Sequence, residues 1–162
     1  MDSKAPVEIS TMPKRILVPM DGSRNAARAA SVAVEYAKRF GAELLVLHVI
    51  AFPAHTLAEV EGGIGRLESS EVEEYFASAR QGVKVVLDEV VKSAEGEGVK
   101  ATGMIVDHAF SVIETILDHA ASNNVDLIVI GSRGLTGFKK LLIGSVSSGV
   151  VSHAHCPVLI VR

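Results

Sequence analysis

The chain is poor in cysteine and in aromatic residues, and these absences restrict its class. Among 162 residues there is one cysteine, Cys156, there is no tryptophan, and aromatic residues make up 4%. A single cysteine cannot form an intramolecular disulfide and is typical of a reducing compartment, which predicts a cytoplasmic protein. The first thirteen residues are polar and broken by proline, unlike a signal peptide, and no apolar run is long enough to span a membrane.

An excess of basic charge is lacking as well. The formal net charge is -3, so we expect neither nucleic acid nor an anionic membrane to be a partner of this chain. A hydrophobic content of 48% and a charged content of 22% indicate a globular fold rather than disorder. The length suits one domain, which we expect to span residues 14–162 after a flexible tail at 1–13.

Short apolar runs alternate with helical patterns along the chain. Leu44 to Ile50, LLVLHVI, is a nearly continuous apolar run, as in strands that are covered on both faces. Ser23 is the predicted N-cap of a helix that ends before Gly41, and the alanines between them repeat at intervals of three and four. The full pattern predicts strands at 16–18, 44–50, 100–106, 127–130 and 158–161, and helices at 23–40, 72–94, 110–120 and 144–154.

This alternation predicts an α/β fold. Strands and helices in this order form a doubly wound, open parallel sheet with right-handed crossovers and helices on both faces. The third helix is expected to place Phe110, Ile113 and Leu117 on one apolar face. Ligands of such sheets bind beyond the carboxyl ends of the strands, where the strand order reverses. The residues that follow the first, second and fourth strands are therefore the candidates for a site.

The stretch after the fourth strand has the most informative pattern. It reads Gly131-Ser132-Arg133-Gly134, then nine residues, then Gly144-Ser145-Val146-Ser147. Glycine lets the backbone approach a ligand, and a helix start near Gly144 would turn free N–H groups and a positive dipole end toward an anion. The pattern indicates a polyphosphate cradle. The alternative is that the glycines only turn the chain and that Ser145 only caps the helix.

Signatures of several enzyme classes are missing. There is no G-x-x-x-x-G-K-[ST] loop and no G-x-G-x-x-G after the first strand, and Ser147 lacks the glycine that a nucleophile elbow requires. No residue is placed as a base that activates water, so we expect no catalytic residue. His153, His155 and Cys156 lie close in sequence, but histidines two apart do not converge on a helix, and we expect no metal site made of protein ligands.

Three motifs together resemble the ATP-binding universal stress proteins. Gly131-x-x-Gly134-x(9)-Gly144-Ser145 matches the family signature G-x-x-G-x(9)-G-[ST]. Val18 to Ser23, Val-Pro-Met-Asp-Gly-Ser, is similar to the first turn of the family, and Cys156 to Val161 is similar to its final strand. The likeness covers residues 14 to 162. It implies a nucleotide-binding domain of five strands in the order 3-2-1-4-5, with strands one and four side by side.

The resemblance also implies a role for each site residue. Asp21 would accept hydrogen bonds from the ribose hydroxyls, Pro19 and Met20 would line the crevice, and the backbone of Val49 would read the adenine edge. The ligand would be ATP, or ADP or AMP, with Mg²⁺ or Mn²⁺ bridging the phosphates. The phosphates would be held by Gly131, Ser132, Gly134, Gly144, Ser145, Val146 and Ser147. In one departure, relatives often have a Gly-x-Pro-like turn after the third strand, where this chain has Asp107-His108-Ala109-Phe110.

The resemblance implies an ATP-binding regulator or sensor of the stress response. Two alternatives stay open: a slow enzyme that hydrolyses ATP or transfers from it, at most a weak ATPase, and a dimeric interaction module that binds no nucleotide. We also expect a homodimer, because the final strand, Val158 to Val161, presents an apolar edge of the kind that proteins usually cover or pair. Dimers through this strand are common in the family.

Overall fold

The structure, a computed structural model of the chain, describes residues 12–53, 69–135 and 143–162. The predicted tail lies outside the described residues up to residue 11. The described ranges contain five strands: β1 Arg15–Pro19, β2 Glu43–Ala51, β3 Ala101–Ala109, β4 Leu127–Gly131 and β5 Val158–Val161. The helices are α1 Arg24–Phe40, α3 Ser69–Gly96, α4 Val112–Ser122 and α5 Ser145–His153.

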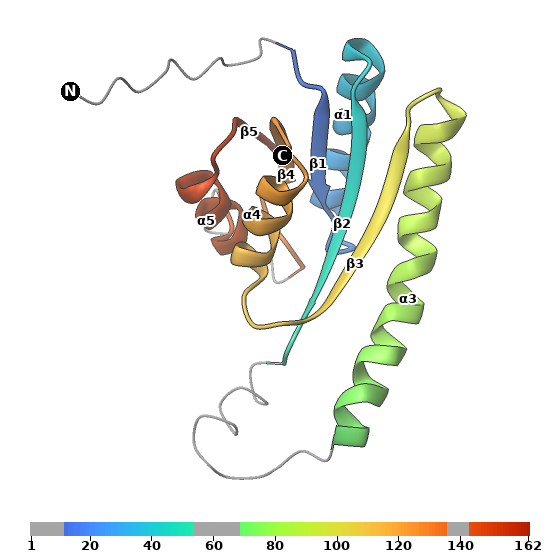
Figure 1. Cartoon of the computed structure of the whole chain (residues 1–162), viewed down its shortest axis with the longest axis vertical. Coiled ribbons are helices and arrows are strands. Elements are labelled where there is room, and N and C mark those ends of the chain that lie inside the picture. Colours follow the sequence, from blue (N-terminus) through green and yellow to red (C-terminus); the bar gives the residue numbers. More distant parts are fainter. Residues whose placement is uncertain (1–11, 54–68, 136–142) are drawn as a thin grey trace, which may run out of the picture.

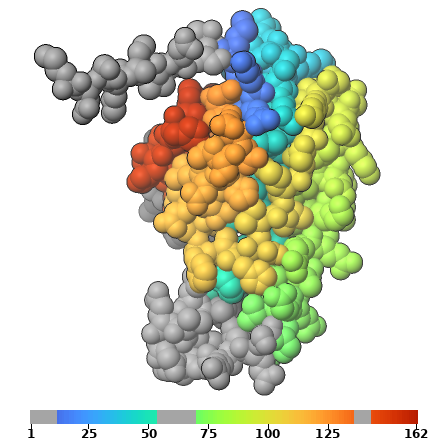
Figure 2. Space-filling model, viewed as in Figure 1, coloured from blue at the N-terminus to red at the C-terminus, as the bar shows by residue number. Residues whose placement is uncertain are grey.

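The five strands form one parallel sheet in the order β3-β2-β1-β4-β5, which confirms the predicted fold and strand order. α1 and α3 cover one face of the sheet, and α4 and α5 cover the other (Figure 1). In the space-filling view, α3 runs along one side of the molecule and α4 lies over the sheet (Figure 2). No helix in the described parts of the chain is both long enough and apolar enough to cross a lipid bilayer.

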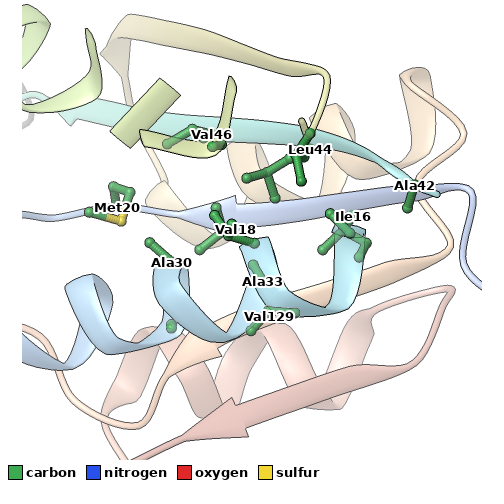
Figure 3. Close-up of a cluster of buried hydrophobic side chains, with 14 of the residues drawn as sticks. Ile16, Val18, Met20, Ala30, Ala33, Ala42, Leu44, Val46 and Val129 are labelled. Carbon is green, nitrogen blue, oxygen red and sulfur yellow. The ribbon is translucent and has the colours of Figure 1, made fainter. Parts of the chain in front are cut away.

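The core beneath α1 is built from small helical residues against branched strand residues. Ala30 and Ala33 lie beside Ile16 and Val18 of β1, and all four are buried (Figure 3). Alanine leaves room for the helix backbone to approach the sheet, and it has the highest helix propensity. The N-cap of α1 is Ser23, whose hydroxyl accepts a hydrogen bond from an α1 N–H at 3.1 Å, and the helix ends before a glycine with a φ of 66°. The predicted start and end of this helix are therefore confirmed.

The opposite face of the same strands forms a second core. Leu17 lies between Ile16 and Val18 in sequence and points to the other side, as neighbouring residues of a strand must. It packs in a cluster with Ile116 of α4 and Val150 of α5, all of them buried. Both faces of β1 are therefore covered, which explains why its apolar run is continuous rather than alternating.

The third strand is longer than the sequence predicts. β3 continues past Val106 to Ala109, and its pairing with β2 shifts register there. His108 has a φ of 54°, in the left-handed region, and after this irregularity the carbonyl of Ala109 accepts a hydrogen bond from the Phe52 N–H at 3.0 Å. The polar residues Asp107 and His108 indicate a loop by composition, but they lie in the strand as a bulge.

Charged side chains tie α3 to this end of β3. Arg80 of α3 pairs with Asp107, and the two ring nitrogens of His108 lie 3.1 Å from Glu73 and 3.2 Å from Asp107. The hydrogen bond from His108 lowers the pKa of Asp107, and the charge of Arg80 adds to the effect, while partial burial opposes it. The ring of His108 also packs on the fully buried Phe76, with 3.9 Å between ring centroids. These contacts hold a polar sequence in a strand.

The expectation that Phe110 lies on the apolar face of the following helix is wrong. The N-cap of α4 is Ser111, whose hydroxyl accepts a hydrogen bond from the Glu114 N–H at 3.3 Å, so the helix begins at Val112. Phe110 is 76% exposed, and its ring stacks on Phe52 with 5.1 Å between centroids. The serine cap determines where this helix starts. Apolar spacing alone predicts the start two residues too early.

Candidate functional site

A cavity of about 220 Å³ lies at the carboxyl ends of β1, β2 and β4. The strand order reverses between β1 and β4, since β2 and β3 lie on one side of β1 and β4 and β5 on the other. The cavity is therefore at the position where open α/β sheets bind ligands. Residues from the starts of α1, α4 and α5 complete its walls.

Ten of the eleven predicted site residues line this cavity. They are Pro19, Met20, Asp21, Val49, Gly131, Gly134, Gly144, Ser145, Val146 and Ser147. The exception is Ser132, whose side chain is buried and not among the lining residues. Its N–H donates to the Val161 carbonyl at 2.7 Å, and its carbonyl accepts from the Gly144 N–H at 2.7 Å. Ser132 thus ties β4 to β5 and to the start of α5 behind the cavity.

Six further residues line the cavity and were not predicted. They are Ala26, Leu47, Val112, Ile116, Ile130 and Arg133. Residue spacing in the sequence could have indicated two of them. Leu47 shares a face of β2 with Val49, and Ile116 lies one helical turn after Val112 on α4. Which face of α4 turns toward the site is decided by helix packing, for which the sequence carries no local signal.

The two carboxylate oxygens of Asp21 have different environments. Oδ1 accepts a hydrogen bond from the Ser23 N–H at 2.9 Å, a local turn that leads into α1. Oδ2 accepts no hydrogen bond within the described residues, and a Cβ added to Gly134 would lie 2.7 Å from it. Because Asp21 also lines the cavity, Oδ2 is available to a hydroxyl donor there.

The start of α5 differs from the starts of α1 and α4. Both of those helices have a serine N-cap with a hydrogen bond, whereas α5 has Gly144 at the N-cap, without a side-chain cap. The proposal that Ser145 merely caps this helix is therefore wrong. The first N–H groups of a helix lack intrahelical partners, and Gly144, Ser145 and Val146 line the cavity. An anion there would accept hydrogen bonds from them and meet the positive end of the helix dipole.

Two glycines of the motif have different surroundings. A Cβ on Gly131 would lie 2.7 Å from the backbone carbon of Asn25, so close packing of α1 against β4 excludes any side chain there. A Cβ on Gly144 would make only ordinary contacts, the nearest at 3.5 Å from Arg133 and Ser132. Packing within the described chain thus explains glycine at 131 but does not require it at 144, where a ligand that approaches the backbone would be a reason for it.

The serine hydroxyls at the start of α5 are not equivalent. Ser147 is buried and its hydroxyl donates to the Gly131 carbonyl at 2.7 Å, which joins α5 to the end of β4. Ser145 is exposed and forms no hydrogen bond within the described residues. Of these two hydroxyls, only that of Ser145 is free to meet a ligand without giving up a contact of the fold.

The histidines do not gather at this cavity. His48 points to the opposite face of the sheet from Leu47, and burial lowers its pKa, although a hydrogen bond with the Met20 backbone and the charge of Asp21 oppose the shift. Rings of the histidines at 153 and 155 bond to separate carbonyls, those of Gly149 and Val125. Across the described ranges, no three His, Cys, Asp or Glu side chains are placed to hold a metal ion.

The fold and the cavity together define the class of protein. It is a doubly wound α/β protein with a cavity at the switch point of a five-stranded parallel sheet, bounded by a carboxylate and by a helix start without a side-chain cap. The sequence matches the Universal stress protein family over residues 12–162. The chain belongs to this family.

Individual relatives are similar over nearly the whole chain. Universal stress protein YxiE of Bacillus subtilis strain 168 is 37% identical over 148 residues, which are 91% of this chain and 98% of that protein. The solved structure of hypothetical protein MJ0577 has a TM-score of 0.76 and 29% identity, and the match covers 93% of this chain and 96% of that one. The Archaeoglobus fulgidus universal stress protein in complex with dAMP shares the fold, with a TM-score of 0.62, 24% identity, and coverage of 93% and 98%.

Proposed function

We propose that this universal stress protein binds ATP, or ADP or AMP, and acts in the cytoplasm as a nucleotide-dependent regulator or sensor of the stress response. One observation carries the proposal: Asp21, the glycine motif and the uncapped start of α5 line a single cavity at the switch point. A carboxylate suits hydroxyl donors and a free helix start suits phosphate, so the two ends of the cavity match the two polar parts of a nucleotide.

The cavity offers a separate environment to each part of the ligand. Leu47, Val49 and Ile116 form an apolar wall that suits a flat purine ring. Asp21 lies at the end of β1 and would receive the ribose hydroxyls. Gly144 and the first turn of α5 would receive the phosphates. This order, base to ribose to phosphate, runs from β2 and α4 toward α5.

A divalent cation fits the phosphate end of this proposal. Mg²⁺ prefers oxygen ligands and is commonly held by substrate phosphates with few protein groups. Ser145 lines the cavity with an unused hydroxyl, and it is the residue that would assist phosphate oxygens in holding Mg²⁺ or Mn²⁺. The cation would neutralise part of the phosphate charge. The proposal rests on the residues of this chain. In another protein of this fold, the universal stress protein from Archaeoglobus fulgidus, the solved structure is a complex with dAMP, an adenine nucleotide.

Replacing Asp21 with alanine is expected to weaken ATP binding by about 1–3 kcal/mol, the usual range for a lost hydrogen bond to a charged group. Isothermal titration calorimetry measures the change. Asp21→Asn is the matched control, because its amide oxygen still accepts from the Ser23 N–H and the volume is kept. For 2′,3′-dideoxy-ATP, wild type and Asp21→Ala should have the same affinity, because this ligand has no ribose hydroxyl to donate to Asp21. An unchanged dissociation constant for Asp21→Ala with ATP would leave Asp21 as a turn residue only.

We also propose that the protein is a homodimer through β5. All four residues of β5 are half-buried, and within the described chain the strand pairs only with β4. An apolar edge with unpaired N–H and C=O groups is a template for strand addition across a two-fold axis. Light scattering at micromolar concentration should therefore find a dimer, and a monomer would contradict the proposal.

The register of β5 indicates which residue a test of the dimer should change. The carbonyl of Pro157 accepts a hydrogen bond from β4, and that of Val161 accepts one from the residue directly after β4. The alternation of a strand therefore turns the N–H groups of Val158 and Ile160 to the free edge. Ile160→Pro removes one N–H from that edge and should shift the protein toward monomer with its fold retained. Leu159→Pro is the contrasting variant, because it breaks the pairing with β4 and should destabilise the fold itself.

A further inference from the structure

Arg133 is the one basic residue among the described residues that line the cavity. Its side chain is half-buried, and it forms no ion pair with any residue in the described ranges. The acidic lining residue, Asp21, does not pair with it either and already accepts a hydrogen bond from the Ser23 N–H. Because this guanidinium is half-buried and has no counter-ion within these ranges, an anion in the cavity would be its natural partner.

The backbone at Arg133 is fixed between two helix starts. The Ser23 hydroxyl, at the start of α1, donates to the Arg133 carbonyl at 3.4 Å. The Gly144 N–H, at the start of α5, donates to the neighbouring Ser132 carbonyl at 2.7 Å. The segment therefore presents the arginine from a backbone that is held on both sides.

The start of α5 adds positive potential near the arginine. Neither α1 nor α5 has an acidic residue in its first turn, whereas α4 has Glu114 there. Each helix start carries the equivalent of about half a positive charge, and acidic residues in the first turn normally offset it. The Asp21 carboxylate accepts a hydrogen bond from the Ser23 N–H at 2.9 Å and offsets the start of α1, so the start of α5 is the one that favours an anion near Arg133.

We propose that Arg133 binds a phosphate oxygen of the nucleotide and sets the preference of the cavity for adenine nucleotides over adenosine. The inference rests on the proposed nucleotide function and assigns the residue that recognises charge within it. A guanidinium presents two parallel N–H donors that match two phosphate oxygens, and such charge-assisted hydrogen bonds are about twice as strong as neutral ones. The apolar wall and Asp21 would bind the adenosine part without help from Arg133.

Binding of ATP and of adenosine to the Arg133→Gln variant tests the inference. The full chain, freed of nucleotide, is titrated with each ligand in a calorimeter with Mg²⁺ present. We expect the affinity for ATP to fall about 10- to 100-fold, as for a lost hydrogen bond between charged groups, and the affinity for adenosine to change less than about twofold. Circular dichroism and the denaturation midpoint of the variant should equal those of the wild type.

Two further variants make the comparison specific. Arg39→Gln removes the same charge from an exposed position in the last turn of α1, about 20 Å along the helix from the cavity, and should leave ATP binding unchanged. Arg133→Lys keeps the charge and loses the paired donors, so it should recover part of the affinity for ATP. The ratio of ATP to adenosine affinity should rank wild type first, then Arg133→Lys, then Arg133→Gln.

Equal losses for ATP and adenosine in Arg133→Gln would overturn the inference, since the residue would then support the cavity rather than bind phosphate. An ATP affinity equal to that of the wild type would overturn it as well. If the proposed function itself is wrong, the result is different, because the wild-type protein then binds neither ATP nor adenosine.

Discussion

Gly131→Ala is expected to lower the free energy of unfolding by about 3 kcal/mol, at the upper end of the range for overpacked sites. The added Cβ would lie 2.7 Å from the backbone carbon of Asn25 and 2.9 Å from the backbone nitrogen of Ala26. Backbone atoms of a helix cannot swing aside as the end of a flexible side chain can. The start of α1 would have to move away from β4, and with it the turn that holds Asp21. Denaturant-induced unfolding, followed by circular dichroism, measures the loss.

Gly82→Ala is the matched control for this prediction. Gly82 lies inside α3, and a Cβ there would meet no atom within 4 Å. Because alanine favours a helix by about 0.8–1.0 kcal/mol over glycine, this variant should be more stable than the wild type. If Gly131→Ala unfolds at the same denaturant concentration as the wild type, α1 does not pack as closely on β4 as the structure has it.

Gly144→Asp is expected to reduce the affinity for ATP by at least about 100-fold while the protein keeps its stability. Aspartate is among the best N-cap residues, and its carboxylate would accept hydrogen bonds from the free N–H groups of α5. A Cβ at this position makes only ordinary contacts, so the fold has room for the side chain. The same carboxylate would occupy the proposed phosphate position and repel phosphate by about 4 kcal/mol at 4 Å with an effective dielectric constant near 20. Calorimetric titration with ATP measures the effect.

Gly144→Asn separates charge from volume in this test. Asparagine has nearly the same size and caps a helix as well as aspartate does, but it carries no charge. It should weaken ATP binding much less than Gly144→Asp does, and both variants should unfold at or above the denaturant concentration of the wild type. Equal ATP affinity for Gly144→Asp and the wild type would mean that phosphate does not bind at the start of α5.

Much of this architecture could be predicted from local patterns in the sequence. α1 was located by its cap, Ser23, by its alanine spacing and by Gly41, because each of these acts over a few residues of chain. Parallel strands were recognised because both of their faces are buried, which leaves continuous apolar runs. The strand order could not be obtained in this way and came from a resemblance, since pairing joins residues far apart in sequence.

The errors arose where contacts distant in sequence overrode the local pattern. Asp107 and His108 look like loop residues, yet ion pairs with α3 hold them in β3. Ser132 belongs to the glycine motif, but its backbone bonds place it behind the cavity. Arg133 lies within the glycine motif but was not predicted to line the site, because the direction of a long side chain depends on its surroundings. Glycine at 131 is explained by packing of α1, which no pattern within the motif reveals.

The most direct test of the account is a calorimetric titration of nucleotide-free, full-length protein with ATP in the presence of Mg²⁺. The account predicts saturable binding with one ATP per chain, because Asp21, Gly144 and Arg133 line one cavity in each chain. Gly144→Asp should bind ATP at least about 100-fold more weakly under the same conditions. No heat of binding for the wild-type protein at millimolar ATP, or equal heats for wild type and Gly144→Asp, would contradict it.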